Sequence, residues 1–159
     1  MNQVKQEIAS IAARLIIEDG SSYYDAKSKA QELVLNQSSL KASKKNIPNN
    51  IELEAAIKKY SMLFYKKEYI QRLTELRKKA KVLMKLLEIF RPILVGSVAN
   101  ETVTKYSDIR ICCFTENTKE IAIELLNKGI NSDSDFLRHP NGKDFVEALT
   151  FIWKEELTI

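Results

Sequence analysis

The chain has 159 residues, of which 45% are hydrophobic and 29% charged, an ordinary composition for a globular protein with a buried core. It contains no run of about 18 apolar residues, as a membrane span requires, and the N-terminus lacks the apolar segment of a signal peptide. We therefore expect a cytoplasmic protein with no membrane partner. Cys112 and Cys113 are the only cysteines. Without a C-x-x-C spacing or a His cluster, they indicate neither structural zinc nor a disulfide framework, and we expect them on the two faces of a strand.

The formal net charge of +4 is unevenly distributed. Residues 1–91 contain 18 Lys and Arg against 10 Asp and Glu, whereas residues 92–159 contain 7 against 11. A basic front half and an acidic back half indicate either two roles or two halves that attract each other.

Residues 1–48 are predicted to form two helices and a linker. Gly20 offers a stop for the first helix, and Ser22 with Asp25 is typical of a new helix start. The polar stretch 36–50 contains Pro48 and has no periodicity, which predicts a linker. The expected inner faces of the two helices are Val4, Ile8, Ile11 and Leu15, followed by Ala26, Ala30, Leu33 and Val34.

Residues 49–91 are predicted to form an antiparallel helical hairpin. Asn49 and Glu52 have the spacing of a capping box at the start of its first helix. The second helix is expected over about 69–90. The stripe of the first is Leu53, Ala56, Tyr60 and Leu63, and the heptad-spaced stripe of the second is Leu73, Leu76, Ala80, Leu83, Leu87 and Phe90.

Residues 92–159 are predicted to form a small α/β unit with a mixed sheet. A helix is expected over 118–128, ended by Gly129. Strands are expected over 93–95, 109–114, 130–137, 145–153 and 156–159. The fold class is therefore α+β: N-terminal helices followed by a small mixed sheet with flanking helices.

One stretch of this unit has residues suited to chemistry. Gly96 and Ser97 directly follow a strand, where main-chain N–H groups and a hydroxyl favour an anion such as a phosphate. Asp108 and Arg110 begin the next strand, and period-two alternation places both on the face opposite Ile109. If the two strands are neighbours, Asp108 lies beside the Gly96 turn.

The stretch LVGSVANETVTKYSDIRI resembles the signature of the nucleotidyltransferase superfamily, which has the polymerase-β-like fold. The resemblance covers residues 86–159, and its specific part runs from Leu94 to Ile111. It implies a Gly-Ser turn that binds the triphosphate of a nucleoside triphosphate, and carboxylates that hold Mg²⁺ for an in-line nucleotidyl transfer.

Carried over to this chain, the resemblance assigns Gly96 and Ser97 to the phosphate turn and Asp108 to the first metal-binding, catalytic carboxylate. Glu156 is the match for a third carboxylate. Arg110 stands where the family has its second carboxylate, and a guanidinium two residues from Asp108 is expected to pair with it and to repel a divalent ion. Arg110 is then either a nucleotide phosphate ligand or a salt-bridge partner.

Two functions follow from these patterns. The first is an enzyme that transfers a nucleotidyl group to an RNA or protein hydroxyl, with Mg²⁺ at Asp108 and Glu156. The second is a catalytically inactive relative that acts as an RNA- or protein-binding module. The candidate nucleic-acid contacts form a basic stripe, which is otherwise a solvated helix face: Arg77, Lys78, Lys81 and Lys85.

Overall fold

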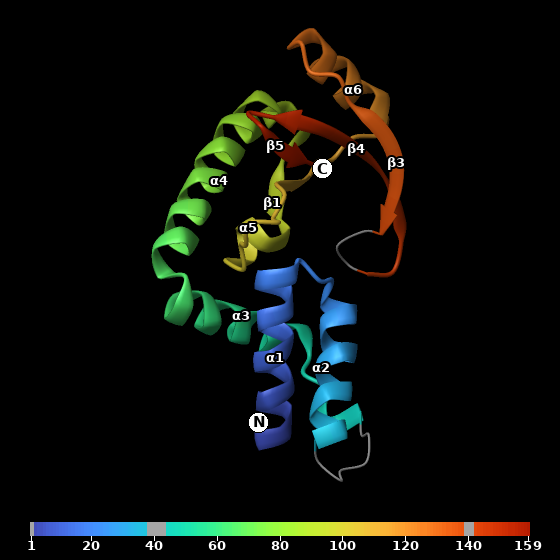
Figure 1. Ribbon diagram of the computed structural model, residues 1–159. Helices are drawn as coiled ribbons and strands as arrows, with labels where there is room; N and C mark the ends of the chain where they lie inside the picture. The colour runs from blue at the N-terminus through green and yellow to red at the C-terminus, as the bar shows by residue number, and fades with distance from the viewer. Residues whose placement is uncertain (1, 38–43, 139–141) are drawn as a thin grey trace. The chain divides into compact units, whose positions relative to one another are not determined.

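The computed structural model describes residues 2–37, 44–138 and 142–159. The chain divides into two compact units, Met1–Arg72 with Thr102–Tyr106, and Leu73–Glu101 with Ser107–Ile159. Figure 1 shows the elements of each unit. No helix within the described residues combines the length and the apolar character that crossing a membrane would take.

The first unit begins with two helices packed together, α1 (Gln3–Asp19) and α2 (Tyr23–Gln37). The predicted boundaries are confirmed: α1 ends at Gly20, whose φ of +69° is left-handed, and the hydroxyl of Ser22 accepts the main-chain N–H of Asp25 at 3.1 Å. Small residues allow the helices to approach closely. Their shared core consists of Ile8, Ala12, Ala13, Ile16, Ile17, Ala26, Ala30 and Val34.

A short 3₁₀ turn, η1 (Lys44–Asn46), precedes α3 (Asn50–Phe64), which completes this core. The capping box is confirmed, because Asn49 and Glu52 exchange main-chain to side-chain hydrogen bonds of 2.8 Å in both directions. The predicted stripe is partly wrong. Leu53 is buried as predicted, and Ala56 and Tyr60 are partly buried against the core, but Leu63 is 67% exposed. The other buried residues of α3 are Ile57 and Ser61, on the side where α1 packs.

The next helix, α4 (Lys66–Leu86), begins three residues before the predicted start and is followed by η2 (Glu88–Phe90). Most of its heptad-spaced residues are buried as predicted, namely Leu76, Ala80, Leu83, Leu87 and Phe90. However, α3 contributes Leu53 and Ile57 to the core of the first unit, whereas α4 contributes Leu83 to that of the second. These helices thus contribute to the cores of different units, and the antiparallel hairpin predicted for 49–91 stays a prediction.

The segment Thr102–Tyr106 belongs to the first unit, although it lies in the sequence between two parts of the second. The Tyr106 ring lies against Gly20, 3.0 Å from the position that a Cβ there would take, and its hydroxyl donates to the Glu18 carbonyl at 3.0 Å. Gly20 thus serves both the left-handed helix end and the close contact with the ring.

The described residues of the second unit form five strands, whose bounds are β1 (Ile93–Val95), β2 (Arg110–Cys112), β3 (Asp133–Arg138), β4 (Phe145–Trp153) and β5 (Glu156–Thr158). They form an antiparallel β1–β2 pair and an antiparallel β3–β4–β5 sheet. A parallel bridge between Ile109 and Thr158 joins the two, so the strand order is β1-β2-β5-β4-β3. The α+β class is confirmed, with two small antiparallel sheets and an isolated parallel bridge between them.

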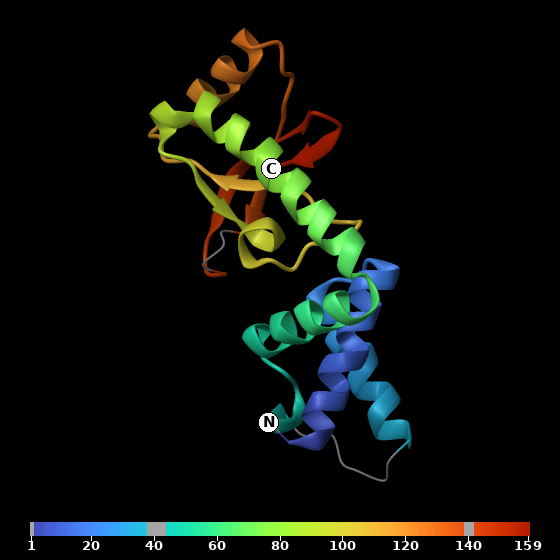
Figure 2. The same cartoon turned by 90° about the vertical axis from the view of Figure 1, so that its left-hand side faces the viewer.

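Helices cover one face of these strands. Figure 2 shows α4 lying across them, and α6 (Thr118–Asn127) packs on the same face. The core between the helices and the strands is Leu83, Leu87, Phe90, Leu125 and Phe151, with Ile111, Cys113 and Leu149 against it. On the opposite face, which we call the open face, side chains such as Ile152 and Leu157 remain exposed.

The turn between β4 and β5 is strained, and we predict that its relief stabilises the second unit. Lys154 and Glu155 have φ values of +47° and +71°, the left-handed pattern that two-residue hairpins normally fill with Asn-Gly. Lys154→Asn combined with Glu155→Gly should raise the free energy of unfolding by about 1 kcal/mol in urea denaturation. The control pair Lys154→Ala and Glu155→Ala removes the same side chains but keeps the strain. An equal gain from that pair would contradict the argument.

Candidate functional site

The glycine turn and the start of β2 lie side by side. Val95, the last residue of β1, pairs with Arg110, and Gly96 follows with a φ of +72° to begin the short helix α5 (Gly96–Asn100). The Arg110 Cδ atom lies 3.3 Å from the position that a Cβ on Gly96 would take. The structure therefore brings Gly96 and Arg110 together, and it shows that β1 and β2 are neighbours, the condition on which the predicted position of Asp108 depended.

Asp108 and Arg110 form a two-pronged ion pair at this place. The Arg110 Nε donates to Asp108 Oδ1 and the terminal Nη2 donates to Oδ2, each at 3.0 Å. The Asp108 side chain is 19% exposed and that of Arg110 is 51% exposed. Hydrogen bonding to Asp108 raises the pKa of the Arg110 guanidinium, so the cation persists at all ordinary pH values.

Glu156 lies on the other face of the strands. Residues paired across neighbouring strands share a face, so Thr158 lies on the helix-covered side with Ile109, and Glu156, two residues before Thr158, lies there too. Its carboxylate accepts from the ammonium of Lys79 on α4 at 2.8 Å. Hydrogen bonds to Glu156 and then to Glu75 raise the pKa of Lys79. The structure does not bring Glu156 to Asp108.

These positions do not form one magnesium site as they stand. Both oxygens of Asp108 bind a guanidinium, and Glu156 is bound to Lys79 on the opposite face. Mg²⁺ is normally held by carboxylates that project into one common place and by oxygen ligands free of a competing cation. We therefore assign no chemical step to a metal ion here, and the assignments of Asp108 and Glu156 to catalysis stay predictions.

Part of the basic stripe on α4 is occupied within the second unit. Arg77 donates to the Val98 carbonyl at 3.2 Å, and Lys85 pairs with Glu88 at 2.8 Å. Lys78 and Lys81 are exposed. The side chain of Arg77 thus fixes the C-terminal part of α5, a role that its position in the stripe did not indicate.

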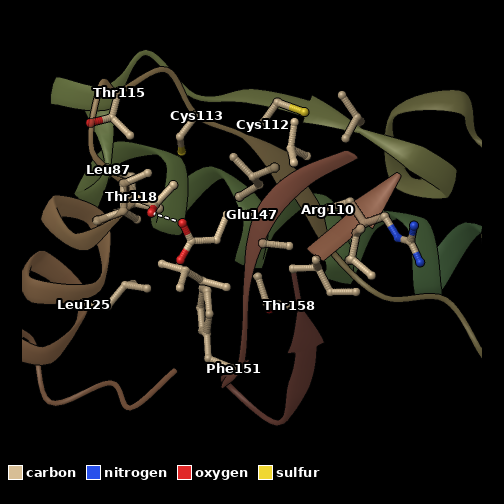
Figure 3. A pocket seen from close by; sticks show the side chains of 18 of the residues that line it. Leu87, Arg110, Cys112, Cys113, Thr115, Thr118, Leu125, Glu147, Phe151 and Thr158 are labelled. Carbon is tan, nitrogen blue, oxygen red and sulfur yellow. Dashed lines mark hydrogen bonds between the residues drawn. The ribbon is translucent and has the colours of Figure 1, made fainter. Parts of the chain in front are cut away.

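A cavity of about 410 Å³ lies between β2, β4 and α6. Figure 3 shows Cys113, Leu125 and Phe151 around it, with Thr118 of α6 donating to Glu147 of β4. Glu147 also accepts from Ser134 at 2.7 Å, and these hydroxyl donors lower its pKa. We refer to this cavity as the β2–β4 slot. The sequence does not predict this cavity, because the residues of a strand do not indicate which other strands will lie beside that strand.

Comparisons of the chain with protein-family models, with curated proteins and with solved structures give no match. The resemblance to nucleotidyltransferases therefore stays a prediction from the sequence motif.

We predict that Gly96→Ala lowers the free energy of unfolding by about 1–2 kcal/mol, because an alanine there would be both left-handed and crowded by the Arg110 side chain. Gly129→Ala is the matched control, since Gly129 has a φ of +77° but no atom within 4 Å of its Cβ position. Urea denaturation should show a larger loss for Gly96→Ala. Equal losses of unfolding free energy in the two variants would mean that the Arg110 side chain moves away from the new Cβ without cost.

We also predict that Cys113 is a poor nucleophile. Burial, with the neighbouring Cys112, raises the pKa of the Cys113 thiol to about 11. At pH 8 its iodoacetamide reaction should be roughly 100-fold slower than that of an ordinary cysteine, because only the thiolate reacts. The rate is measured in a Cys112→Ser variant, with the urea-unfolded chain as the reference. Similar rates in the folded and unfolded states would contradict the burial of this thiol.

Proposed function

We propose that the chain is a nucleotidyltransferase-like protein that does not transfer nucleotidyl groups and acts instead as a protein-binding module. The proposal depends on one observation above all: the two-pronged ion pair of Asp108 and Arg110 beside the Gly96 turn. In the resemblance of the sequence motif, Asp108 and Arg110 correspond to the two positions at which the family has metal-binding carboxylates.

The alternative is an active transferase with a single Mg²⁺ at Asp108 and Glu156 and a nucleoside triphosphate on Gly96, Ser97 and Arg110. The positions of the carboxylates favour the inactive protein. A metal ion would have to displace a guanidinium that holds both oxygens of Asp108, and charge-assisted pairs of this kind are among the stronger hydrogen bonds in proteins. Glu156 would in addition have to leave Lys79 and cross to the other face of the strands.

The choice of a protein rather than an RNA partner follows from the surface of the second unit. Two of the four basic residues proposed for nucleic acid, Arg77 and Lys85, have partners within the unit. The β2–β4 slot, by contrast, has mostly apolar walls, including Leu87, Ile111 and Leu125. Apolar clefts with few polar groups favour ligands that bury hydrophobic surface. The phosphate backbone of RNA is charged and offers no such surface.

Restoring the second carboxylate tests the degenerate metal site. We predict that Arg110→Asp raises the affinity for Mg²⁺ in the presence of ATP, measured by calorimetry, because a second acid replaces a repelling cation. Without metal the two acids repel, so the variant should melt at a lower temperature than the parent and recover with added Mg²⁺.

Arg110→Asn is the control, since it removes the guanidinium without adding a carboxylate. It should gain less Mg²⁺ affinity than Arg110→Asp. If Arg110→Asp leaves both the metal affinity and the metal-dependent melting unchanged, Asp108 does not correspond to a metal ligand and the likeness to nucleotidyltransferases fails. Nucleotidyl transfer by the parent protein with ATP and Mg²⁺ would instead establish the enzyme.

A further inference from the structure

The β2–β4 slot is bounded by the main chains of two strands. In the β2–β5 bridge, Ile109 and Ile111 direct their N–H and C=O groups to β5, so alternation directs those of Cys113 to the same side. Leu157 and Ile159 bond to β2, which leaves Glu156 and Thr158 to bond to Trp153 and Phe151 of β4. By the same alternation, the main-chain groups of Leu149 and Glu147 on β4 also point to this side.

Strand β5 lies between β2 and β4 along part of their length, and residues of both strands beyond that part line the cavity. In the described part of the chain, the main-chain groups of Cys113, Glu147 and Leu149 that point into the slot make no hydrogen bond to another main-chain group. Two strand edges therefore face each other across a cavity, with N–H donors and C=O acceptors on both sides. Such edges are templates for an additional strand.

The side-chain lining agrees with a strand whose residues alternate between the two faces. On the helix-covered side, Leu87, Leu125 and Phe151 line the slot. On the open side, Cys112 and Ala148 line it, with Arg110 at the end next to Ile159. A strand in the slot would thus place every second side chain against an apolar wall, which suits Val, Ile or Leu.

The charges that line the slot favour a carboxylate at one end. The charge of Arg110 is compensated by the ion pair with Asp108. The Glu147 carboxylate accepts hydrogen bonds from the hydroxyl groups of Thr118 and Ser134. Arg138 lies over the Phe145 ring, and it forms no ion pair with any other residue that the structure describes. It lies at the end of the slot toward which β2 runs.

We propose that the β2–β4 slot binds a short extended peptide of a partner protein, inserted parallel to β2, with alternating β-branched residues and a carboxylate at its C-terminal end. The peptide bonds to β2 through one set of alternate main-chain groups and to β4 through the other. This inference deepens the proposed binding function by naming its partner, and its test does not involve Asp108, so the two can fail separately.

The probe is a synthetic, fluorescently labelled peptide, Thr-Val-Thr-Val-Thr-Val-Glu, added to the 159-residue chain. We expect saturable binding by fluorescence anisotropy, together with slowed amide hydrogen exchange at Cys113, Glu147 and Leu149 measured by NMR. The exposed edge of β1 serves as a reference, because its exchange should stay unchanged.

Two control peptides distinguish insertion from binding at a single edge. Each carries N-methyl groups on one set of alternate amides, which removes half of the donors. A strand between two strands uses both sets, so either peptide should bind at least tenfold more weakly than the parent peptide. A strand on an outer edge uses only one set and tolerates methylation of the other.

Charge reversal at Arg138 tests the orientation. Arg138→Glu should weaken the acid-ended peptide roughly two- to fivefold, as expected for an exposed ion pair, and leave the same peptide with Gln and a C-terminal amide unaffected. Lys154→Glu is the matched control, because Lys154 lies at the far end of β4 and should change neither affinity.

Three outcomes would overturn the proposal. The first is unchanged exchange at Cys113 and Leu149 with saturating peptide. The second is full affinity for either methylated peptide, which would place the strand at an outer edge. The third is equal loss from Arg138→Glu for the acidic and amidated peptides, which would remove the assigned orientation.

Discussion

Three main-chain hydrogen bonds between β2 and β5 hold the strands of the second unit in one arrangement. Ile109 donates to Leu157 at 3.0 Å, while Ile159 donates to Ile109 and Ile111 donates to Ile159, each at 2.9 Å. These bonds fix the register between two otherwise separate antiparallel pieces, and register decides which side chains share a face. They also set the spacing of β2 and β4, because β5 lies between these two strands.

The same register keeps two acid–base pairs apart. Asp108 pairs with Arg110 on the open face, and Glu156 pairs with Lys79 on the covered face. Each carboxylate is neutralised by its own cation, so neither contributes negative potential to a common centre. A family that uses clustered acids for metal chemistry needs the opposite arrangement, in which acids converge and cations stay away.

Features set by near neighbours could be predicted from the sequence. Gly20 ends a helix, Asn49 caps one, and Arg110 reaches Asp108, because each depends on backbone geometry within a few residues. The face on which Glu156 lies could not be predicted from the sequence, since it depends on the pairing between residues 109 and 158. The buried face of α3 depends likewise on its packing against α1. The likeness of the whole sheet to a nucleotidyltransferase is a prediction of that second, long-range kind.

The loop Thr102–Tyr106 has a consequence for dividing the protein into fragments. Its residues lie in the sequence between α5 and β2 but pack with the first unit, so the chain passes from one unit to the other three times. A fragment ending at residue 91 therefore lacks Tyr106, and Gly20 and the Glu18 carbonyl lose their cover. Conversely, a fragment starting at residue 92 contains the loop Thr102–Tyr106 but lacks Gly20 and Glu18, which Tyr106 contacts. Limited proteolysis or truncation at a single point cannot release either unit whole.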